Sequence, residues 1–304
     1  MKMKLIPLLA LGLLAACQRT PDTPPAAPVA TSTAGLNAAQ KLELDLMRAV
    51  FGDAVRVASG QAQALADLPA VGQPNARDAM KVVPLGARLL ANGQAALVTA
   101  AIPRDSEDMP GERPDALAAS ISAYLLEKVA GRWTLTQRRE SIAAVGSHGE
   151  TGDLAWLDLG QGRTGFALEG ESANRGQTIR TLSVFDLGAS NVAPLPAHTI
   201  RIHNDNDGDC EDERPRCWHV SGRWRMLAPQ GAAPAELEVT FQGVLEQRAA
   251  DAQALPKPAS EAADYADEIP PRDKRQVKAT ARYALHAKGL QLLSGENIAE
   301  GIDG

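Results

Sequence analysis

The chain has 304 residues, a formal net charge of -6 at pH 7 and 4% aromatic residues. This length suffices for one large or two small domains with a sizeable core. The negative charge disfavours nucleic acids and anionic lipid head groups as partners, and the scarcity of aromatic side chains argues against exposed stacking platforms for sugars or single strands.

The chain begins with the features of a secretory signal. Lys2 and Lys4 precede an apolar run from Leu5 to Ala16, which matches the positive region and the short apolar region of such a signal. The run is too short for a bilayer core, which takes about 20 apolar residues. We therefore expect residues 1–16 to be a signal peptide rather than a transmembrane anchor.

The end of this segment is more specific than an ordinary signal. Leu14-Ala15-Ala16-Cys17 resembles the lipobox of bacterial lipoproteins. The resemblance implies cleavage before Cys17 and acylation of that residue; an ordinary signal with a coincidental cysteine is the alternative. Gln18 in place of an aspartate implies an outer-membrane anchor with the body facing the periplasm. The three acyl chains of such a lipoprotein exceed the two signals that stable attachment requires.

Residues 17–35 are expected to be the lipidated cysteine and a tether. Four prolines lie there among Thr, Ala and Ser, a composition that buries too little apolar surface to fold. The tether would hold a body formed by residues 36–304 off the membrane. The protein would then contact the membrane only through its lipid.

The body begins with a helical pattern and continues with patterns of period two. Apolar residues recur at helical spacing over 36–52, with Asn37 as the cap and Gly52 as the stop. Short strand patterns follow, with turns expected at Asn92-Gly93, Ala130-Gly131 and Ser221-Gly222 and a polar connection at about 249–271. This predicts one mainly β domain, an antiparallel sandwich or open barrel with one N-terminal helix packed on it.

Two five-residue stretches share the pattern V-x-G-R-W. Val129 to Trp133 and Val220 to Trp224 each lie between strand patterns. Two matches without a sustained period do not make a repeat protein. We interpret both as glycine turns that lead back into a sheet, with a duplicated binding element as the alternative.

The sequence offers no convincing catalytic residue and no nucleotide site. Gly160 to Gly165 matches G-x-G-x-x-G, but a strand pattern follows where the dinucleotide fingerprint requires a helix. No G-x-S-x-G and no H-E-x-x-H occurs. We therefore expect a glycine-rich strand connection at this place, and a protein without nucleotide or nucleic acid partners.

The stretch HNDNDGDCEDERPRCWH, from His203 to His219, concentrates acids, cysteines and histidines. Its cysteine spacing lacks the close pair of structural zinc motifs, and in an oxidising compartment Cys210 and Cys217 should form a disulfide. The ring of eight residues would stabilise the fold by about 2.5 kcal/mol in the loop-entropy estimate. The expected result is a stapled hairpin with an exposed acidic tip.

The acids of this stretch partly match a calcium loop. Asp205, Asp207 and Asp209 occupy the first three ligand positions of an EF-hand, with Glu211 beside them. Cys210 replaces the required glycine and Arg216 the bidentate glutamate. A weak Ca²⁺ site and a metal-free acidic loop therefore both remain open; otherwise no cofactor is expected.

From Gly162 onward the pattern G-x-G-F-x-x-E, followed by an Asn/Asp-rich segment with two cysteines, resembles uncharacterised secreted proteins of Gram-negative bacteria over residues 140–245. The resemblance implies no activity. We expect a non-enzymatic envelope lipoprotein with a binding or structural role, its partner an envelope protein or glycan. A calcium-dependent binding or adhesion module and an envelope hydrolase with an unrecognised site are the alternatives.

Overall fold

A computed structural model describes residues 36–104, 117–188, 199–210, 214–228, 235–248, 271–286 and 289–302. All of them belong to one compact unit, Thr33–Gly304. The predicted signal peptide, the lipidation at Cys17, the tether and most of the polar connection lie outside the described residues. Among the described residues, no helix has the length and apolar character needed to span a bilayer.

The one α-helix among the described residues, α1, spans Ala38–Phe51. The Asn37 side chain accepts a hydrogen bond from the Gln40 backbone at 2.9 Å, and the Gln40 side chain accepts one from the Asn37 backbone at 3.0 Å. This capping box satisfies two N–H groups that the first turn leaves free. Gly52 ends the helix with a positive φ of 58°, a conformation that favours glycine. The predicted helix and both its ends are confirmed.

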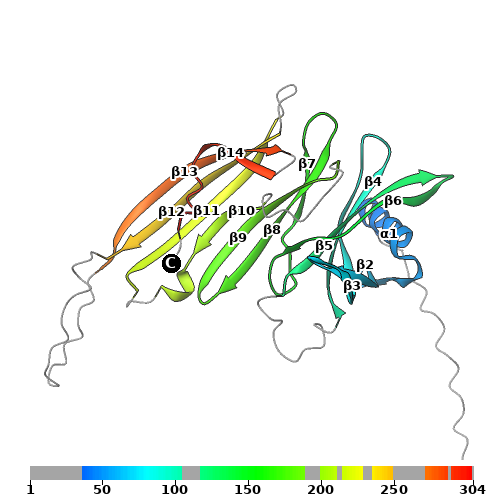
Figure 1. Cartoon of the computed structure of the whole chain (residues 1–304), viewed down its shortest axis with the longest axis horizontal. Coiled ribbons are helices and arrows are strands. Elements are labelled where there is room, and N and C mark those ends of the chain that lie inside the picture. The colour runs from blue at the N-terminus through cyan, green and yellow to red at the C-terminus, as the bar shows by residue number, and fades with distance from the viewer. Residues whose placement is uncertain are drawn as a thin grey trace, which may run out of the picture. The chain divides into compact units, whose positions relative to one another are not determined.

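Six strands form the first antiparallel sheet, in chain order (Figure 1). The Asn92-Gly93 turn joins β3 to β4 and the Ala130-Gly131 turn joins β5 to β6, as predicted. Ala130 and Gly131 both have positive φ, 48° and 82°, as a tight hairpin turn requires. The strands are β1 (Val55–Ala58), β2 (Gln61–Ala70), β3 (Gln73–Leu89), β4 (Ala95–Pro103), β5 (Ala119–Val129) and β6 (Arg132–Val145).

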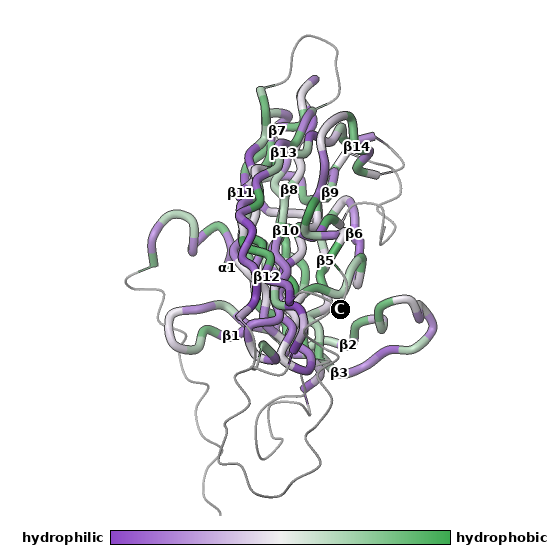
Figure 2. The backbone as a smooth tube through the Cα atoms, turned by 90° about the vertical axis from the view of Figure 1, so that its left-hand side faces the viewer, coloured by the Kyte–Doolittle hydropathy of each residue, from purple (hydrophilic) through white to green (hydrophobic). Residues whose placement is uncertain are grey.

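Eight strands form the second antiparallel sheet, again in chain order. Figure 2 shows hydrophilic and hydrophobic stretches alternating along these strands. The strands are β7 (Leu154–Asp158), β8 (Thr164–Asn174), β9 (Gln177–Asp186), β10 (Thr199–Asp205), β11 (Arg216–Leu227), β12 (Glu236–Gln247), β13 (Asp273–His286) and β14 (Gly289–Gly295).

Three apolar clusters hold these layers together. Helix α1 packs on one face of the first sheet, where Leu46, Met47 and Tyr124 are fully buried. The other face of that sheet packs on β8 and β9 of the second sheet, around the stacked rings of Phe166 and Phe185. The fold is therefore a mainly β sandwich of two open sheets with one helix, as predicted.

The third cluster lies on the opposite side of the second sheet, which we call the inner face. The C-terminal segment, Glu296–Ile302, lies against this face: Ala299 and Ile302 are buried there among side chains such as Leu237, Val239 and Phe241. We call the other side of β10 to β13 the outer face. Because side chains alternate along a strand, even-numbered residues of β11 point inward and odd-numbered ones outward.

The predicted turn at Ser221-Gly222 is wrong. Both residues lie in the middle of β11, which pairs without interruption with β12 from Arg216 to Leu227. A Cβ atom on Gly222 would lie 2.8 Å from Cε1 of Phe241. This glycine therefore makes room for an aromatic ring on the inner face instead of turning the chain.

The glycine-rich stretch after β7 is the strand connection that the sequence predicts. The backbone N–H of Leu159 donates a hydrogen bond to the Arg163 carbonyl oxygen across it, and β8 follows directly. Arg163 forms an ion pair with Asp186 at 2.8 Å. Asp186, which a dinucleotide site would need for a ribose, is therefore engaged by an arginine.

Candidate functional site

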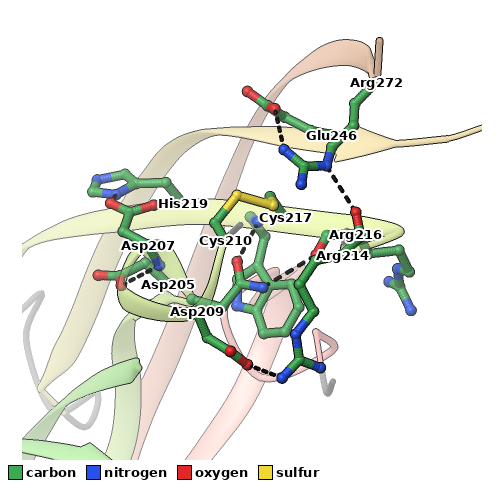
Figure 3. The surroundings of a disulfide bond; sticks show 12 residues. Asp205, Asp207, Asp209, Cys210, Arg214, Arg216, Cys217, His219, Glu246 and Arg272 are labelled. Carbon is green, nitrogen blue, oxygen red and sulfur yellow. Dashed lines mark hydrogen bonds and ion pairs between the residues drawn. A yellow bond between two sulfur atoms is a disulfide. The ribbon is translucent and has the colours of Figure 1, made fainter. Parts of the chain in front are cut away.

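The acidic stretch forms the connection between β10 and β11 (Figure 3). Cys210 and Cys217 are at disulfide distance, with their sulfur atoms 1.90 Å and their Cα atoms 5.6 Å apart, which agrees with the predicted pairing. A short 3-10 helix, Asp207–Asp209, precedes Cys210. The carboxylate of Asp207 is exposed, as predicted for the tip, whereas Asp205 is buried at the end of β10.

Two aspartates and two histidines meet on the outer face at the base of this loop. His203 and Asp205 project from β10, and their Nε2 and Oδ2 atoms lie 2.5 Å apart. His219 projects from β11, with Nδ1 2.8 Å from Oδ2 of Asp207. The pairing of His203 with Ser221 and of Asp205 with His219 across the two strands brings the pairs together.

The hydroxyl of Ser221 lies between the two histidines. It is 2.8 Å from Nδ1 of His203 and 3.5 Å from Nε2 of His219. An ionised carboxylate only accepts hydrogen bonds, so a neutral His203 that donates to Asp205 through Nε2 accepts from Ser221 through Nδ1. We call Asp205, Asp207, His203, His219 and Ser221 together the Asp-His cluster.

Three members of this cluster can bind one metal ion. One donor atom each from Asp205, Asp207 and His219 lie within 4.8 Å of one another. The remaining contacts hold these donors in place, because Asp205 Oδ1 accepts from the Asp207 backbone at 3.1 Å and Oδ2 contacts His203. Such contacts to the ligating groups orient a metal site.

The other two predicted calcium ligands are not part of this set. Asp209 points away from His219 and forms an ion pair with Arg214 (Figure 3). Glu211 lies outside the described residues. The structure thus brings together Asp205 and Asp207 from the sequence-based set and adds His219, which is not part of the calcium pattern.

Sequence reasoning also missed the network beneath the cluster on the inner face. Asn204, fully buried, accepts from Trp218 Nε1 and Gln177 Nε2, both at 2.9 Å. It donates to the carbonyl oxygens of Ala299 at 3.0 Å and Ile302 at 2.7 Å. The available signal was the alternation of the strand, which places Asn204 opposite to His203 and Asp205.

No protein-family model, no curated protein and no solved structure matches this chain. A function for it therefore has to be inferred from its own side chains.

Proposed function

We propose that this chain is a lipid-anchored protein of the outer membrane that faces the periplasm and binds a divalent transition-metal ion, such as Zn²⁺, without catalysis. The convergence of buried Asp205 with exposed Asp207 and His219, whose donor atoms lie within 4.8 Å of one another, supports metal binding. The lipobox ending at Cys17 and the proline-rich tether support the anchor.

The chemistry of the three donors favours a transition-metal ion. Zn²⁺ is commonly held by three protein ligands drawn from His, Asp, Glu and Cys, with an open position for water or another molecule. The two carboxylates balance the charge of the ion. The side chains of Asp207 and His219 are 63% and 48% exposed, so an ion and a bound partner can reach them from solvent.

Calcium fits these donors less well. Ca²⁺ takes six to eight oxygen ligands, whereas the cluster supplies two carboxylates and an imidazole nitrogen. Asp209, which would add an oxygen, is neutralised by Arg214. We therefore expect the site to bind Zn²⁺ in preference to Ca²⁺.

Titration of the purified chain with Zn²⁺ and with Ca²⁺, followed by calorimetry and by melting temperature, tests the proposal. We expect Zn²⁺ to bind and to raise the melting temperature, because a ligand that binds only the folded state stabilises it. His219→Asn should weaken Zn²⁺ binding at least tenfold. His286→Asn, which replaces an exposed histidine of β13 far along the chain from the cluster, should leave it unchanged.

Zn²⁺ binding should also weaken on acidification. Nδ1 of His219 faces Asp207, and a metal ion between them needs this nitrogen free of its proton. No melting-temperature shift at millimolar Zn²⁺, or an undiminished shift in His219→Asn, would refute the metal site. A shift with Ca²⁺ alone would favour the calcium-dependent module instead.

The anchor has a separate test. Cells that express the chain are labelled with an alkyne-bearing palmitate analogue. We expect label on the wild-type protein and none on Cys17→Ser, which should also leave the membrane fraction. Equal labelling of both chains, or membrane association that survives Cys17→Ser, would contradict the proposal.

A second candidate function is hydrolysis, because Ser221, His203 and Asp205 form the hydrogen-bonded order of a catalytic triad. The strand context argues against it. Ser221 lies mid-strand and β11 is paired on both sides, so its backbone N–H is used by the sheet and cannot stabilise an oxyanion. Ester turnover that Ser221→Ala abolishes would overturn the non-catalytic proposal; we expect no turnover.

A further inference from the structure

Three adjoining pockets surround Arg216 at the end of the second sheet that carries the disulfide. Their volumes are about 390, 330 and 560 Å³, each within the range of about 300 to 1,000 Å³ that is usual for small-molecule sites. Arg216 lines all three, Trp218 lines the first two, and Leu245 and Arg275 line the first and third.

The strand register explains why these side chains gather on one face. Trp218 of β11 lies opposite Leu245 of β12, which lies opposite Arg275 of β13. Arg216 lies two residues before Trp218 and so projects from the same side. This is the inner face, and we call the surface that these four residues share the Arg216 groove.

The floor of the groove is apolar. Leu245 and Val277 are partly buried and pack against the inner-face cluster. Ile298 and Ile302 of the C-terminal segment line the largest of these three pockets. The Trp218 indole is fixed by its hydrogen bond to Asn204. This surface is therefore formed by side chains that the fold already holds in place.

The rim of the groove is cationic. Arg216 and Arg275 are exposed, and no described residue forms an ion pair with either of them. Figure 3 shows the Arg216 guanidinium without an interaction to any residue drawn. Other arginines nearby are paired: Arg214 contacts Asp209, and Arg272 contacts Glu246.

The acidic residues near the groove do not cancel this charge. Glu246, which lines the first pocket, pairs with Lys274 at 2.6 Å. Asp273 lines that pocket too, but three arginines line it as well: Arg216, Arg248 and Arg275. In the largest of the three pockets, Glu296 is the one acidic lining residue beside three basic ones, Arg216, Arg275 and Lys278. The groove thus keeps an excess of positive charge beside an apolar floor.

We propose that the Arg216 groove binds an amphipathic anion: an alkyl chain that lies on Leu245, Val277 and Trp218 and carries a carboxylate or phosphate head group between Arg216 and Arg275. Guanidinium groups bind such oxygens with two parallel hydrogen bonds. Burial of each methylene of the alkyl chain tightens binding by about fourfold, so head group and chain both contribute. This site is separate from the Asp-His cluster on the outer face.

Calorimetric titration of the purified chain with four probes tests this inference. The probes are octyl phosphate, octanoate, octyl glucoside and inorganic phosphate, all below the concentration at which the octyl compounds form micelles. We expect octyl phosphate and octanoate to bind at least tenfold more tightly than octyl glucoside, which lacks the charge, and than inorganic phosphate, which lacks the chain.

Three single variants locate the site. Arg216→Gln and Arg275→Gln should each weaken octyl phosphate binding at least tenfold. Arg223→Gln is the matched control, because Arg223 is an exposed arginine of the same strand on the outer face, and it should have no effect. All three positions are exposed, so the variants should fold. Zn²⁺ binding should be unchanged in all three, which would show that weaker octyl phosphate binding comes from the groove and not from the Asp-His cluster.

Several results would overturn the inference. Equal binding of octyl glucoside and octyl phosphate would show an apolar site that ignores charge. Equal binding of inorganic phosphate and octyl phosphate would show a simple anion site. Absence of binding, or weakening by Arg223→Gln as large as that by Arg216→Gln, would show that the groove does not hold the ligand.

Discussion

The two faces of the β10–β11 hairpin use polar residues in opposite ways. On the inner face, Asn204 is fully buried and all four of its hydrogen-bonding contacts are made, to side chains and to the C-terminal segment. On the outer face, Asp207 and His219 contact each other but stay exposed. Neighbouring residues of one strand therefore differ in role: Asn204 belongs to a structural network, and Asp205 belongs to the candidate binding site.

This difference separates polar groups that stabilise the fold from those that can bind a ligand. A buried polar side chain costs free energy unless its hydrogen bonds are satisfied, and Asn204 meets that condition completely. The carboxylate of Asp207 on the outer face is 63% exposed, so it keeps lone pairs that face solvent and that a metal ion can use. Because its hydrogen bonds are satisfied, the Asn204 network stabilises the fold and offers no free group to a ligand.

The largest effect should come from removing the inner network. Asn204→Ala leaves the Trp218 and Gln177 donors and the Ile302 carbonyl oxygen without their Asn204 partner, whereas the Ala299 carbonyl keeps a hydrogen bond from Arg201 at 3.3 Å. Each unsatisfied buried group costs about 1 to 3 kcal/mol. We expect the free energy of unfolding in urea to fall by about 3 kcal/mol or more. Asp207→Asn on the outer face should change it by less than about 0.5 kcal/mol. Similar effects of the two changes would contradict the division between the faces.

Removal of the disulfide should have the next largest effect on the free energy of unfolding, because the disulfide closes the connection between β10 and β11. Replacement of Cys210 and Cys217 by alanine should lower the free energy of unfolding by about 2.5 kcal/mol. Zn²⁺ affinity should fall as well, since the loop no longer holds Asp207 beside His219. Reduction of the wild-type protein should reproduce the loss of stability. Unchanged Zn²⁺ affinity in the alanine double variant would mean that the strands alone position the ligands.

Two adjacent residues of β11 sharpen the comparison. Gly222→Ala places a Cβ 2.8 Å from the Phe241 ring on the inner face, and overpacking of this kind costs about 1 to 3 kcal/mol. Ser221→Ala on the outer face removes one hydrogen bond to His203, which is worth about 1 kcal/mol. Urea unfolding of the two variants should rank them in this order, and the reverse ranking would show that Gly222 is not needed for packing.

The smallest effect concerns acid stability on the outer face. Hydrogen bonds from Arg225, and then from Arg282, hold the pKa of the Glu238 carboxyl below its usual value of 4.5, although burial opposes them. Because the folded-state pKa is lowered, Glu238 stabilises the fold above pH 4.5, and this contribution is lost as the pH falls through the lowered value. Glu238→Gln should therefore lose less stability than wild type between pH 4.5 and the acid transition.

Urea midpoints measured at several pH values check this prediction. Asp153→Asn is the matched control and should follow the wild-type curve, because Asp153 is exposed before β7 and forms no hydrogen bond or ion pair with a described residue. The same acid dependence in Glu238→Gln and wild type would mean that the two arginines do not stabilise the ionised carboxyl.

The features that the sequence predicted correctly are local. The capping residues Asn37 and Gly52 act within a turn of their own positions, and Ala130-Gly131 needs only positive φ at two neighbouring residues. The Cys210–Cys217 pair is separated by 7 positions, so a short loop brings the sulfurs together. Patterns of period two likewise reveal strands, because alternation is a property of the strand itself.

The second V-x-G-R-W shows where local reasoning fails. The same five-residue pattern makes a turn at Gly131 and continues a strand at Gly222. What distinguishes them is Phe241, which comes from β12 and packs over Gly222. A pentapeptide contains no information about a ring contributed by another strand, so the turn predicted at Ser221-Gly222 was wrong.

The sequence by itself determined the fold class, the helix and its caps, and the pairing of the two cysteines, because each depends on composition, alternation or a short loop. Only the tertiary structure decided which acids meet. Asp209 forms an ion pair with Arg214, whereas Asp205 contacts His203 and Asp207 contacts His219. The strand register likewise placed Arg216 and Arg275 on one face over Leu245. Register depends on the packing of whole sheets, and no short stretch of the chain encodes it.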